Sequence, residues 1–374
     1  MFATRLFRWS YQHILKPIAF RLDPEDVHDA MIRVASYAQR STSMKKMFYR
    51  CFEFSHPTLE QTIHGIHFTN PIGLSAGFDK NAEIINAIAS TGFGFTEVGS
   101  ITGEPCAGNP KPRLWRLPKS QAIMVWYGLK NDGCVAIAHR LRGQQFPIPV
   151  GTSVARTNDK TTVELGAGIA DYAKAFRELA DIGSYTTINI SCPNTCGGEP
   201  FTSPERLELL LNSIDTIPTL KPIFLKLPAD LTFSDADALI AVARNHRVHG
   251  FIVSNLTKQR QSPDIDHSEL SEAMRGGISG KPTFDRSNAL IAHIFQAAGD
   301  RFTIIGVGGV FSAADAYEKI RCGASLVQLI TGLIFEGPQL VGEINRGLVM
   351  LLKNDGFANI HEAVGSRLNK RSFR

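Results

Sequence analysis

Two asparagines around a cysteine give the strongest local indication of chemistry in this sequence. Asn189, Cys192 and Asn194 follow directly after a short β-rich run. The amide groups can donate to and accept from a planar polar ligand, and a thiol can exchange a proton with it. A loop cysteine is also compatible with an inert small side chain, because reactivity requires a lowered pKa that a sequence does not display.

Lys226 is a second candidate, because it interrupts the otherwise apolar run at residues 223–227 (IFLKL). A buried ammonium group requires a negatively charged partner. The edge of a reduced flavin ring is one such partner. A neighbouring carboxylate in a structural ion pair is the alternative, since buried lysines are rare unless they are paired.

Glycines near the end of the chain predict a phosphate site. Gly308 and Gly309 follow one β-rich run, and Thr331 and Gly332 follow the next. Glycine lets the backbone approach a ligand closely, so that N–H groups and a helix N-terminus can hold a phosphate dianion, with the Thr331 hydroxyl as a further donor. Glycine pairs are common in turns, so the argument depends on their place after the last two strands of a barrel.

The elements that position these residues are predicted by β-rich runs that alternate with helical or loop-rich stretches. The runs lie at residues 72–76, 93–99, 148–153, 186–190, 222–227, 250–254, 302–306 and 325–330. They favour a closed (β/α)₈ TIM barrel of the α/β class over an open doubly wound sheet, for which a GxGxxG turn is expected and is lacking. The active site of such a barrel lies where the strands end.

Polar and glycine residues gather at these predicted strand ends. They are Gly77, Lys80, Ser100, Ser153, Arg156, Asn189, Cys192, Asn194, Lys226, Asn255, Gly308, Gly309, Thr331 and Gly332. The sequence therefore predicts one rim on which these groups converge.

Length and composition narrow the class of protein. A single barrel takes roughly 250 residues, so 374 residues leave room for an extension. Hydrophobic residues at 43% and charged residues at 20% are ordinary for a globular protein, and a net charge of +5 without blocks of like charge makes nucleic acid an unexpected partner. The six scattered cysteines are expected to be reduced thiols in a cytosolic compartment. Cys192 and Cys196 lack a second ligand pair, so no metal site is predicted.

Residues 1–54 form a predicted helical extension, and residues 55–374 the barrel domain. The first 20 residues space apolar side chains at helical intervals with cations between them, and Pro17 is expected to interrupt that helix. A second helix is predicted to begin after the N-cap Asp23 and a third to cover residues 44–54. No apolar run is long enough to span a bilayer, and the extension is not expected to be a secretory signal. The amphipathic helices either lie on a membrane surface or cap the barrel, and the pattern leaves both open.

Seven motifs in order give the chain a family resemblance. They are residues 70–80 (NPIGLSAGFDK), 92–100 (GFGFTEVGS), 108–117 (GNPKPRLWRL), 189–194 (NISCPN), 276–280 (GGISG), 305–309 (IGVGG) and 331–338 (TGLIFEGP). Together they closely resemble dihydroorotate dehydrogenase over nearly the whole chain. Residues 20–28 (FRLDPEDVH) also resemble the extension of the membrane-associated, quinone-using class, which favours the membrane-surface hypothesis.

This resemblance implies FMN as the cofactor. The FMN-binding residues that it implies are Ala76, Gly77, Lys80, Ser100, Ser153, Asn189, Lys226, Ser254, Gly277, Gly280, Gly308, Gly309, Thr331 and Gly332. The residues that it implies for dihydroorotate or an analogue are Lys80, Asn189, Asn194 and Asn255.

The resemblance also implies the reaction. Cys192 stands where the family places its base, which takes a proton from C5 of the substrate while a hydride leaves C6 for the flavin beside Lys226. His28 and Arg116 match positions that resemble the quinone site. The implied function is oxidation of dihydroorotate to orotate in pyrimidine biosynthesis, with a quinone as electron acceptor. The implied location is peripheral, on the cytoplasmic face of the inner membrane if the source is bacterial.

Several residues depart from the family pattern. The quinone-using class usually has serine in place of Cys192. A pyrimidine-binding asparagine is replaced by Val125, a strand-end asparagine by Ser153, a serine or threonine by Leu256 and a tyrosine by Ile330. Each lost polar partner costs about 1–3 kcal/mol of binding. A diverged flavoenzyme acting on another small cyclic or unsaturated substrate, and a non-catalytic membrane-surface protein, therefore remain alternatives.

Overall fold

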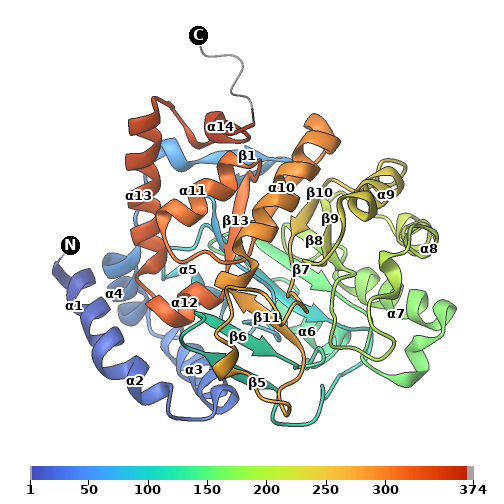
Figure 1. The fold of residues 1–374 in the computed structure, drawn as a ribbon, viewed down its shortest axis with the longest axis horizontal. Coiled ribbons are helices and arrows are strands. Elements are labelled where there is room, and N and C mark those ends of the chain that lie inside the picture. The colour runs from blue at the N-terminus through green and yellow to red at the C-terminus, as the bar shows by residue number, and fades with distance from the viewer. Residues whose placement is uncertain (1, 369–374) are drawn as a thin grey trace.

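The predicted β-rich runs form a closed barrel of parallel strands in the computed structural model, which describes residues 2–368 (Figure 1). The barrel strands are β3 (Ile72–Leu74), β4 (Phe95–Ile101), β7 (Val150–Val154), β8 (Tyr185–Asn189), β9 (Ile223–Leu227), β10 (Gly250–Val253), β12 (Thr303–Val307) and β13 (Leu326–Leu329). They close in the order β10-β12-β13-β3-β4-β7-β8-β9. Strands of a parallel barrel are covered on both faces, which explains why the sequence marks them as apolar runs.

The barrel interior is sealed at the amino-terminal ends of the strands. An antiparallel hairpin of β1 (Gln61–Ile63) and β2 (Ile66–Phe68) lies there, and the Phe68 ring meets the Phe95 ring edge-on at 5.4 Å. Above this aromatic layer, the buried carboxylate of Glu97 accepts hydrogen bonds from Thr187 Oγ1 at 2.9 Å and Gln328 Nε2 at 3.2 Å. The barrel is therefore a filled core, and its opposite end is left for the site.

Helices surround the barrel and follow its strands (Figure 1). They are α5 (Ile85–Ala89), α6 (Cys134–Leu141), α7 (Leu165–Leu179), α8 (Pro204–Asp215), α9 (Phe233–Ala243), α10 (Phe284–Ala298), α11 (Ala313–Arg321), α12 (Thr331–Glu336), α13 (Leu340–Asp355) and α14 (Ile360–Ala363). Their inward faces join the strands in one large apolar core. The α/β barrel predicted from the sequence is confirmed.

A small antiparallel sheet stands beside the carboxyl ends of the barrel strands. It consists of β5 (Leu114–Leu117), β6 (Ala122–Val125) and β11 (Gly277–Gly280), in the order β11-β6-β5. In its register Val125 lies opposite both Gly277 and Leu114. The sequence-based prediction did not include this sheet.

The extension consists of α1 (Phe2–Ser10), α3 (Pro24–Ala38) and α4 (Thr42–Phe52), with a π-helical turn (Tyr11–Leu15) and the short α2 (Lys16–Ala19) after α1. Asp23 caps α3, as predicted, and Oδ1 accepts from the N–H groups of Glu25 and Asp26. The expected interruption at Pro17 is wrong. The proline stands in the first turn of α2, where a missing N–H is tolerated, and the chain stays helical.

The extension packs on the barrel domain. Tyr11 Oη donates to the carbonyl of Ile334 at 2.6 Å, and Gln12 Nε2 donates to the carbonyl of Phe335 at 3.0 Å. Phe7 meets Phe52 edge-on. No helix within residues 2–368 has the length and apolar character needed to cross a bilayer.

Candidate active site

A cavity opens at the carboxyl ends of the barrel strands, between the barrel, the small sheet and α3. It holds about 1320 Å³ of space free of protein atoms, counted with its mouth. The predicted site residues that line it are His28, Ala76, Gly77, Lys80, Ser100, Asn189, Cys192, Asn194, Lys226, Ser254, Asn255, Gly280, Gly308, Gly309, Thr331 and Gly332. Ser153, Arg156, Gly277 and Arg116 are not in its wall. The structure thus brings most of the predicted rim together.

Lys226 is buried in the cavity floor without a carboxylate partner. Its Nζ donates to Ser75 Oγ at 3.1 Å, and no ion pair of the described residues includes it. Burial lowers its pKa, and the charge of Glu97 only partly offsets this effect. The sequence left a structural ion pair as the alternative role of Lys226. The described part of the chain contains no such pair. A buried cation facing a cavity requires an anionic or electron-rich ligand.

A chain of hydrogen bonds fixes the polar groups next to Lys226. Asn189 Nδ2 donates to Ser100 Oγ at 2.8 Å, and the Ser100 and Ser153 hydroxyl groups are 2.8 Å apart. Ser153 therefore supports the cavity-lining Ser100 from outside the wall. Asn189 Oδ1 accepts from Ser191 Oγ at 2.8 Å, which orients the amide at the end of β8.

The loop after β8 carries Cys192 and Asn194 over the cavity. Asn194 Nδ2 donates to the carbonyl of Val125 at 2.9 Å, and Asn255 Nδ2 donates to Ser191 Oγ at 2.8 Å, so the loop is tied to the small sheet and to the end of β10. Burial raises the pKa of the Cys192 thiol to about 11. The N–H of Asn194 and the charge of Lys226 lower this pKa, but burial outweighs them. The thiol is therefore neutral at neutral pH in the absence of a ligand.

The opposite end of the cavity offers free backbone donors. Gly308 and Gly309 have φ of 118° and 69°, a conformation that favours glycine. Within residues 2–368, no protein acceptor takes the N–H of either glycine. Thr331 Oγ1 lies 2.8 Å from Ser279 Oγ at the start of α12. A phosphate group fits this end and an electron-rich ring fits the Lys226 end, so the residues present fit FMN.

Gly277 contributes to the wall indirectly. A Cβ on this glycine would lie 2.6 Å from Leu256 Cβ, so its small size allows Leu256 to pack against β11. Leu256, Val125 and Ile330, three of the departures from the family pattern, all line the cavity. The wall that Val125 and Leu256 form beside Gly277 is therefore apolar.

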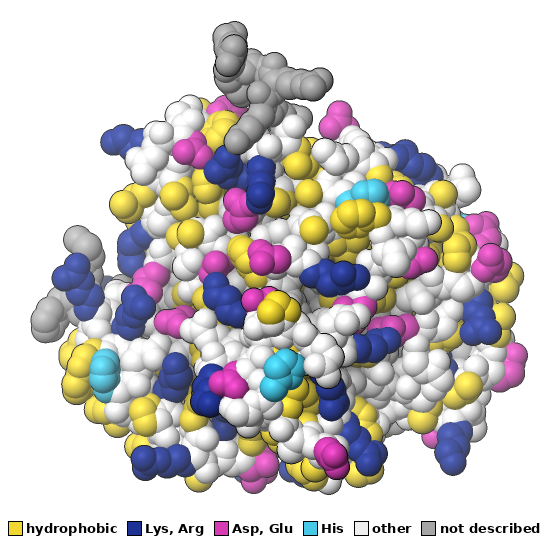
Figure 2. All heavy atoms as spheres, viewed as in Figure 1, with side chains coloured by type: hydrophobic (Ala, Val, Ile, Leu, Met, Phe, Trp, Pro, Cys, Tyr) yellow, Lys and Arg dark blue, Asp and Glu magenta, His cyan; other side chains and the backbone are white. Residues whose placement is uncertain are grey.

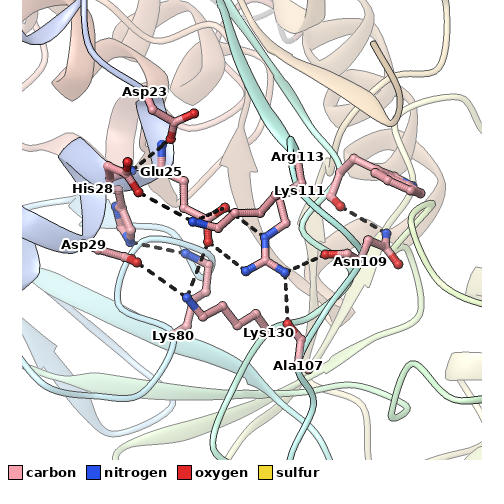
Figure 3. Close-up of polar contacts among 12 residues, drawn as sticks. Asp23, Glu25, His28, Asp29, Lys80, Ala107, Asn109, Lys111, Arg113 and Lys130 are labelled. Carbon is pink, nitrogen blue, oxygen red and sulfur yellow. Dashed lines mark hydrogen bonds and ion pairs between the residues drawn. The ribbon is translucent and has the colours of Figure 1, made fainter. Parts of the chain in front are cut away.

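A buried ion cluster joins α3 to the loops around the small sheet (Figure 3). Glu25 is buried and receives a two-pronged contact from Arg113, with Nη2 to Oε1 at 2.7 Å and Nε to Oε2 at 2.9 Å. Lys130 Nζ lies 3.4 Å from Glu25 and 3.6 Å from Asp29, and Lys111 Nζ lies 3.7 Å from Glu25. The extension is thus attached by charge at the cavity mouth.

His28 of the same helix contacts Lys80 directly (Figure 3). The Lys80 Nζ and His28 Nε2 atoms are 3.2 Å apart, and Nζ lies 4.0 Å from the centre of the Tyr127 ring. Burial lowers the pKa of Lys80 to about 8, and burial together with the Lys80 charge lowers that of His28 to about 3. An ammonium has only donors, so neutral His28 accepts through Nε2.

Arg116 lies on β5, outside the cavity wall, and its side chain contacts the extension. Its Nη1 donates to the carbonyl of Leu22 at 2.9 Å, and its guanidinium lies 4.7 Å from the centre of the Phe20 ring. Its predicted role at a quinone site stays a prediction.

Sequence reasoning missed Glu25, Arg113, Lys130 and Tyr127. Glu25 was visible only as an acidic residue near the start of a helix, and its partner is 88 residues away. Tyr127 lines the cavity. Its buried Oη has no hydrogen-bond partner among the described residues. Arg113 lies in the motif at residues 108–117, and its place in that motif was the available signal.

A parallel barrel whose strand ends surround one polar cavity has the architecture of the (β/α)₈-barrel enzymes. The family model for dihydroorotate dehydrogenase matches residues 58–352. The chain belongs to this family, whose members are FMN-dependent oxidoreductases.

Individual relatives agree with this assignment. Proteins named dihydroorotate dehydrogenase (quinone) from Natronomonas pharaonis and Gloeobacter violaceus are 39% and 38% identical to this chain over 352 and 353 residues. Each alignment covers 94% of this chain and 98% of the relative. The solved structure of an Eimeria tenella DHODH in complex with ferulenol has a TM-score of 0.81 and 28% identity, and covers 93% of this chain and 96% of that one. The family predicted from the motifs is confirmed.

Proposed function

We propose that this protein oxidises dihydroorotate to orotate, with FMN as its cofactor and a quinone as the electron acceptor. The observation that carries this proposal is the meeting of Lys226, Cys192 and three asparagine side chains at one end of a cavity whose other end offers free backbone N–H groups. The names of the relatives support both the substrate and the acceptor.

Bound FMN would accept a hydride from the substrate and pass the electrons on to the quinone. Lys226 would lie against the flavin ring and balance the negative charge that develops there. Cys192 would take the proton from C5 of the substrate, and the positive charge of Lys226 favours its thiolate form. Lys80, Asn189, Asn194 and Asn255 would hold the pyrimidine.

The quinone would enter between α3 and the barrel. That side of the cavity combines His28 with the apolar side chains of Leu114, Ile123 and Ile334. A flat apolar ring with polar oxygens suits such a wall. Arg116 would lie near the outer end of this path, where its guanidinium is fixed by Leu22 and Phe20.

Peripheral membrane contact through the extension belongs to the same proposal. Large apolar side chains on its outer side are exposed, among them Leu15 at 51% and Ile18 at 56%. Figure 2 shows apolar and cationic side chains together at the edge formed by α1 and α2. An apolar face with flanking cations suits anionic lipid, and in a bacterium this would be the cytoplasmic face of the inner membrane.

Vesicle co-sedimentation tests the membrane contact. The wild-type protein is expected to bind vesicles that contain anionic phospholipid, and the Leu15→Glu/Ile18→Glu variant to remain in the supernatant. Leu209→Glu on α8, at a position with 48% exposure away from the extension, is the matched control and should bind like the wild type. Equal binding by all three proteins would contradict the assignment of the face.

A second candidate function rests on the apolar wall. Val125 and Leu256 offer no polar group to a pyrimidine, so the pocket suits a less polar cyclic or unsaturated substrate as well. An anaerobic spectrum distinguishes the two candidates. Dihydroorotate should bleach the oxidised flavin, and a quinone should restore its colour. A flavin that stays oxidised with dihydroorotate would exclude the first candidate and favour the second.

A further inference from the structure

Lys319 is a buried cation that the proposed reaction does not use. It lies on α11 with 0% exposure. Its Nζ donates to Ser287 Oγ and, at 2.9 Å, to Asn288 Oδ1, both on α10. Within the described chain no carboxylate forms an ion pair with it, so the ammonium has only neutral acceptors and the nearby Phe284 ring.

Such an ammonium group is costly to bury, because neutral hydrogen bonds replace only part of its hydration. Burial lowers the pKa of Lys319 to about 7. Asp315 on the same helix is engaged by Lys281 at 3.1 Å and by the N–H of Phe311 at 2.9 Å. Asp285 is exposed, and Cys322 is held neutral because burial raises its pKa. Among residues 2–368, Lys319 therefore lacks a full counter-charge.

The position of Lys319 in the fold suggests where such a counter-charge comes from. A Cβ on Gly306, in β12, would lie 3.4 Å from Lys319 Cδ. Ser287, which accepts from Lys319, lies directly behind Gly308, because a Cβ on that glycine would be 3.4 Å from Ser287 Cβ. Gly308 lines the end of the cavity where the free N–H groups lie. Lys319 is thus one layer of side chains behind the proposed phosphate site.

We propose that Lys319 is the buried counter-charge of the flavin phosphate, acting across Ser287 and the Gly308 backbone, and that it takes up a proton from solvent when the phosphate binds. This inference rests on the FMN binding proposed above. The incoming dianion stabilises the ammonium form, so a neutral amine becomes an ammonium and no other bond changes. The phosphate is not touched by Lys319, which is a positioning residue rather than a direct ligand.

Proton uptake makes the affinity for FMN depend on pH in a way that the affinity for riboflavin does not. Above the pKa of the flavin-free lysine, binding of the phosphate must recruit a proton, so FMN binding weakens as pH rises by up to about tenfold per unit. Riboflavin lacks the phosphate and recruits none. Both ligands share the flavin ring, so pH effects on ring binding cancel in the preference for FMN over riboflavin. The remaining pH dependence reports proton uptake that accompanies phosphate binding.

Flavin exchange in the holoenzyme measures that preference. The protein is dialysed against mixtures of FMN and riboflavin at several pH values from about 7 to 9, above the range in which the phosphate itself titrates near pH 6. The bound flavins are then extracted and quantified. The wild type should lose preference for FMN steadily over this range. Lys319→Met should show a smaller preference without the slope. Lys353→Met removes an exposed cation on α13, and it should keep the slope.

The outcomes separate the inference from the proposed function. A wild-type preference that does not change with pH overturns the role of Lys319, and this result needs no variant if Lys319→Met fails to fold. A Lys319→Met protein that keeps the wild-type slope overturns it as well. If the protein as purified contains no flavin and binds neither, the proposed function itself is wrong.

Discussion

Removing the charge of Glu25 should release the extension from the cavity mouth. In Glu25→Gln the buried Arg113 loses its anionic partner, and Lys130 and Lys111 lose one of theirs. Breaking one side of a buried ion pair costs about 3–5 kcal/mol. Applied to the docking of α3, 3 kcal/mol corresponds to about a 100-fold larger population of the undocked state.

Hydrogen exchange measures this change directly. Amide protons of α3 should exchange about 100-fold faster in Glu25→Gln, whereas those of the barrel strands keep their protection. Asp26→Asn is the matched control on the same helix, because the exposed Asp26 carboxylate has a single ion-pair partner among the described residues, Lys111 at 3.5 Å. Its exchange should stay within a few-fold of the wild type. Activity with quinone should fall more in Glu25→Gln than flavin reduction by dihydroorotate, because the proposed quinone path runs along α3.

Lowering the pH should also release α3 from the barrel domain, because protonation removes the charge of Glu25. Burial alone raises the pKa of Glu25, but the hydrogen bond and charge of Arg113, with Lys111 and Lys130, outweigh it, so the pKa lies below its ordinary value. The contribution of a carboxyl group with a lowered pKa is complete above its unfolded pKa, about 4.3, and is lost as pH falls through the folded value. If the α3 amides of Glu25→Gln exchange as slowly at neutral pH as those of the wild type, the Glu25 ion pairs do not hold the extension in place.

Three further predictions concern the cavity. Because burial raises the pKa of Cys192 to about 11, the rate of flavin reduction should climb nearly tenfold per pH unit from about pH 6 to 9, and a flat profile in stopped-flow measurements would argue against a base at this position. Lys226→Met should weaken retention of reduced flavin by about 10- to 100-fold relative to oxidised flavin, measured by ultrafiltration after dithionite, and equal retention would remove the charge-balancing role. Val125→Asn should lower KM for dihydroorotate by about fivefold or more by adding an amide to the apolar wall, whereas an unchanged KM would support a different substrate.

The sequence was most informative where one physical requirement acts locally. A parallel barrel strand must be apolar on both faces, so all the barrel strands could be placed from short runs, and a lysine inside one of them was already unusual. Asp23 before Pro24 likewise specified a helix start by its own hydrogen bonds. These features need no knowledge of distant parts of the chain.

Features that depend on distant partners could not be predicted. The Glu25–Arg113 pair joins residues 88 apart, and nothing local to either indicates burial. The raised pKa of Cys192 depends on a pocket assembled from several strands. Arg116 has the residue type that a quinone site needs, but the direction of its side chain depends on Phe20 in the extension.

The small sheet links two of the apolar residues that line the pocket, Val125 and Leu256. Val125 lies opposite Gly277 in the sheet, and Gly277 in turn makes room for Leu256. The two apolar residues are therefore neighbours of the same glycine. Exchanging only one of them for a polar residue alters the space available to the other, so their effects will not add. The effect of exchanging both residues on substrate preference will therefore differ from the sum of the two single exchanges.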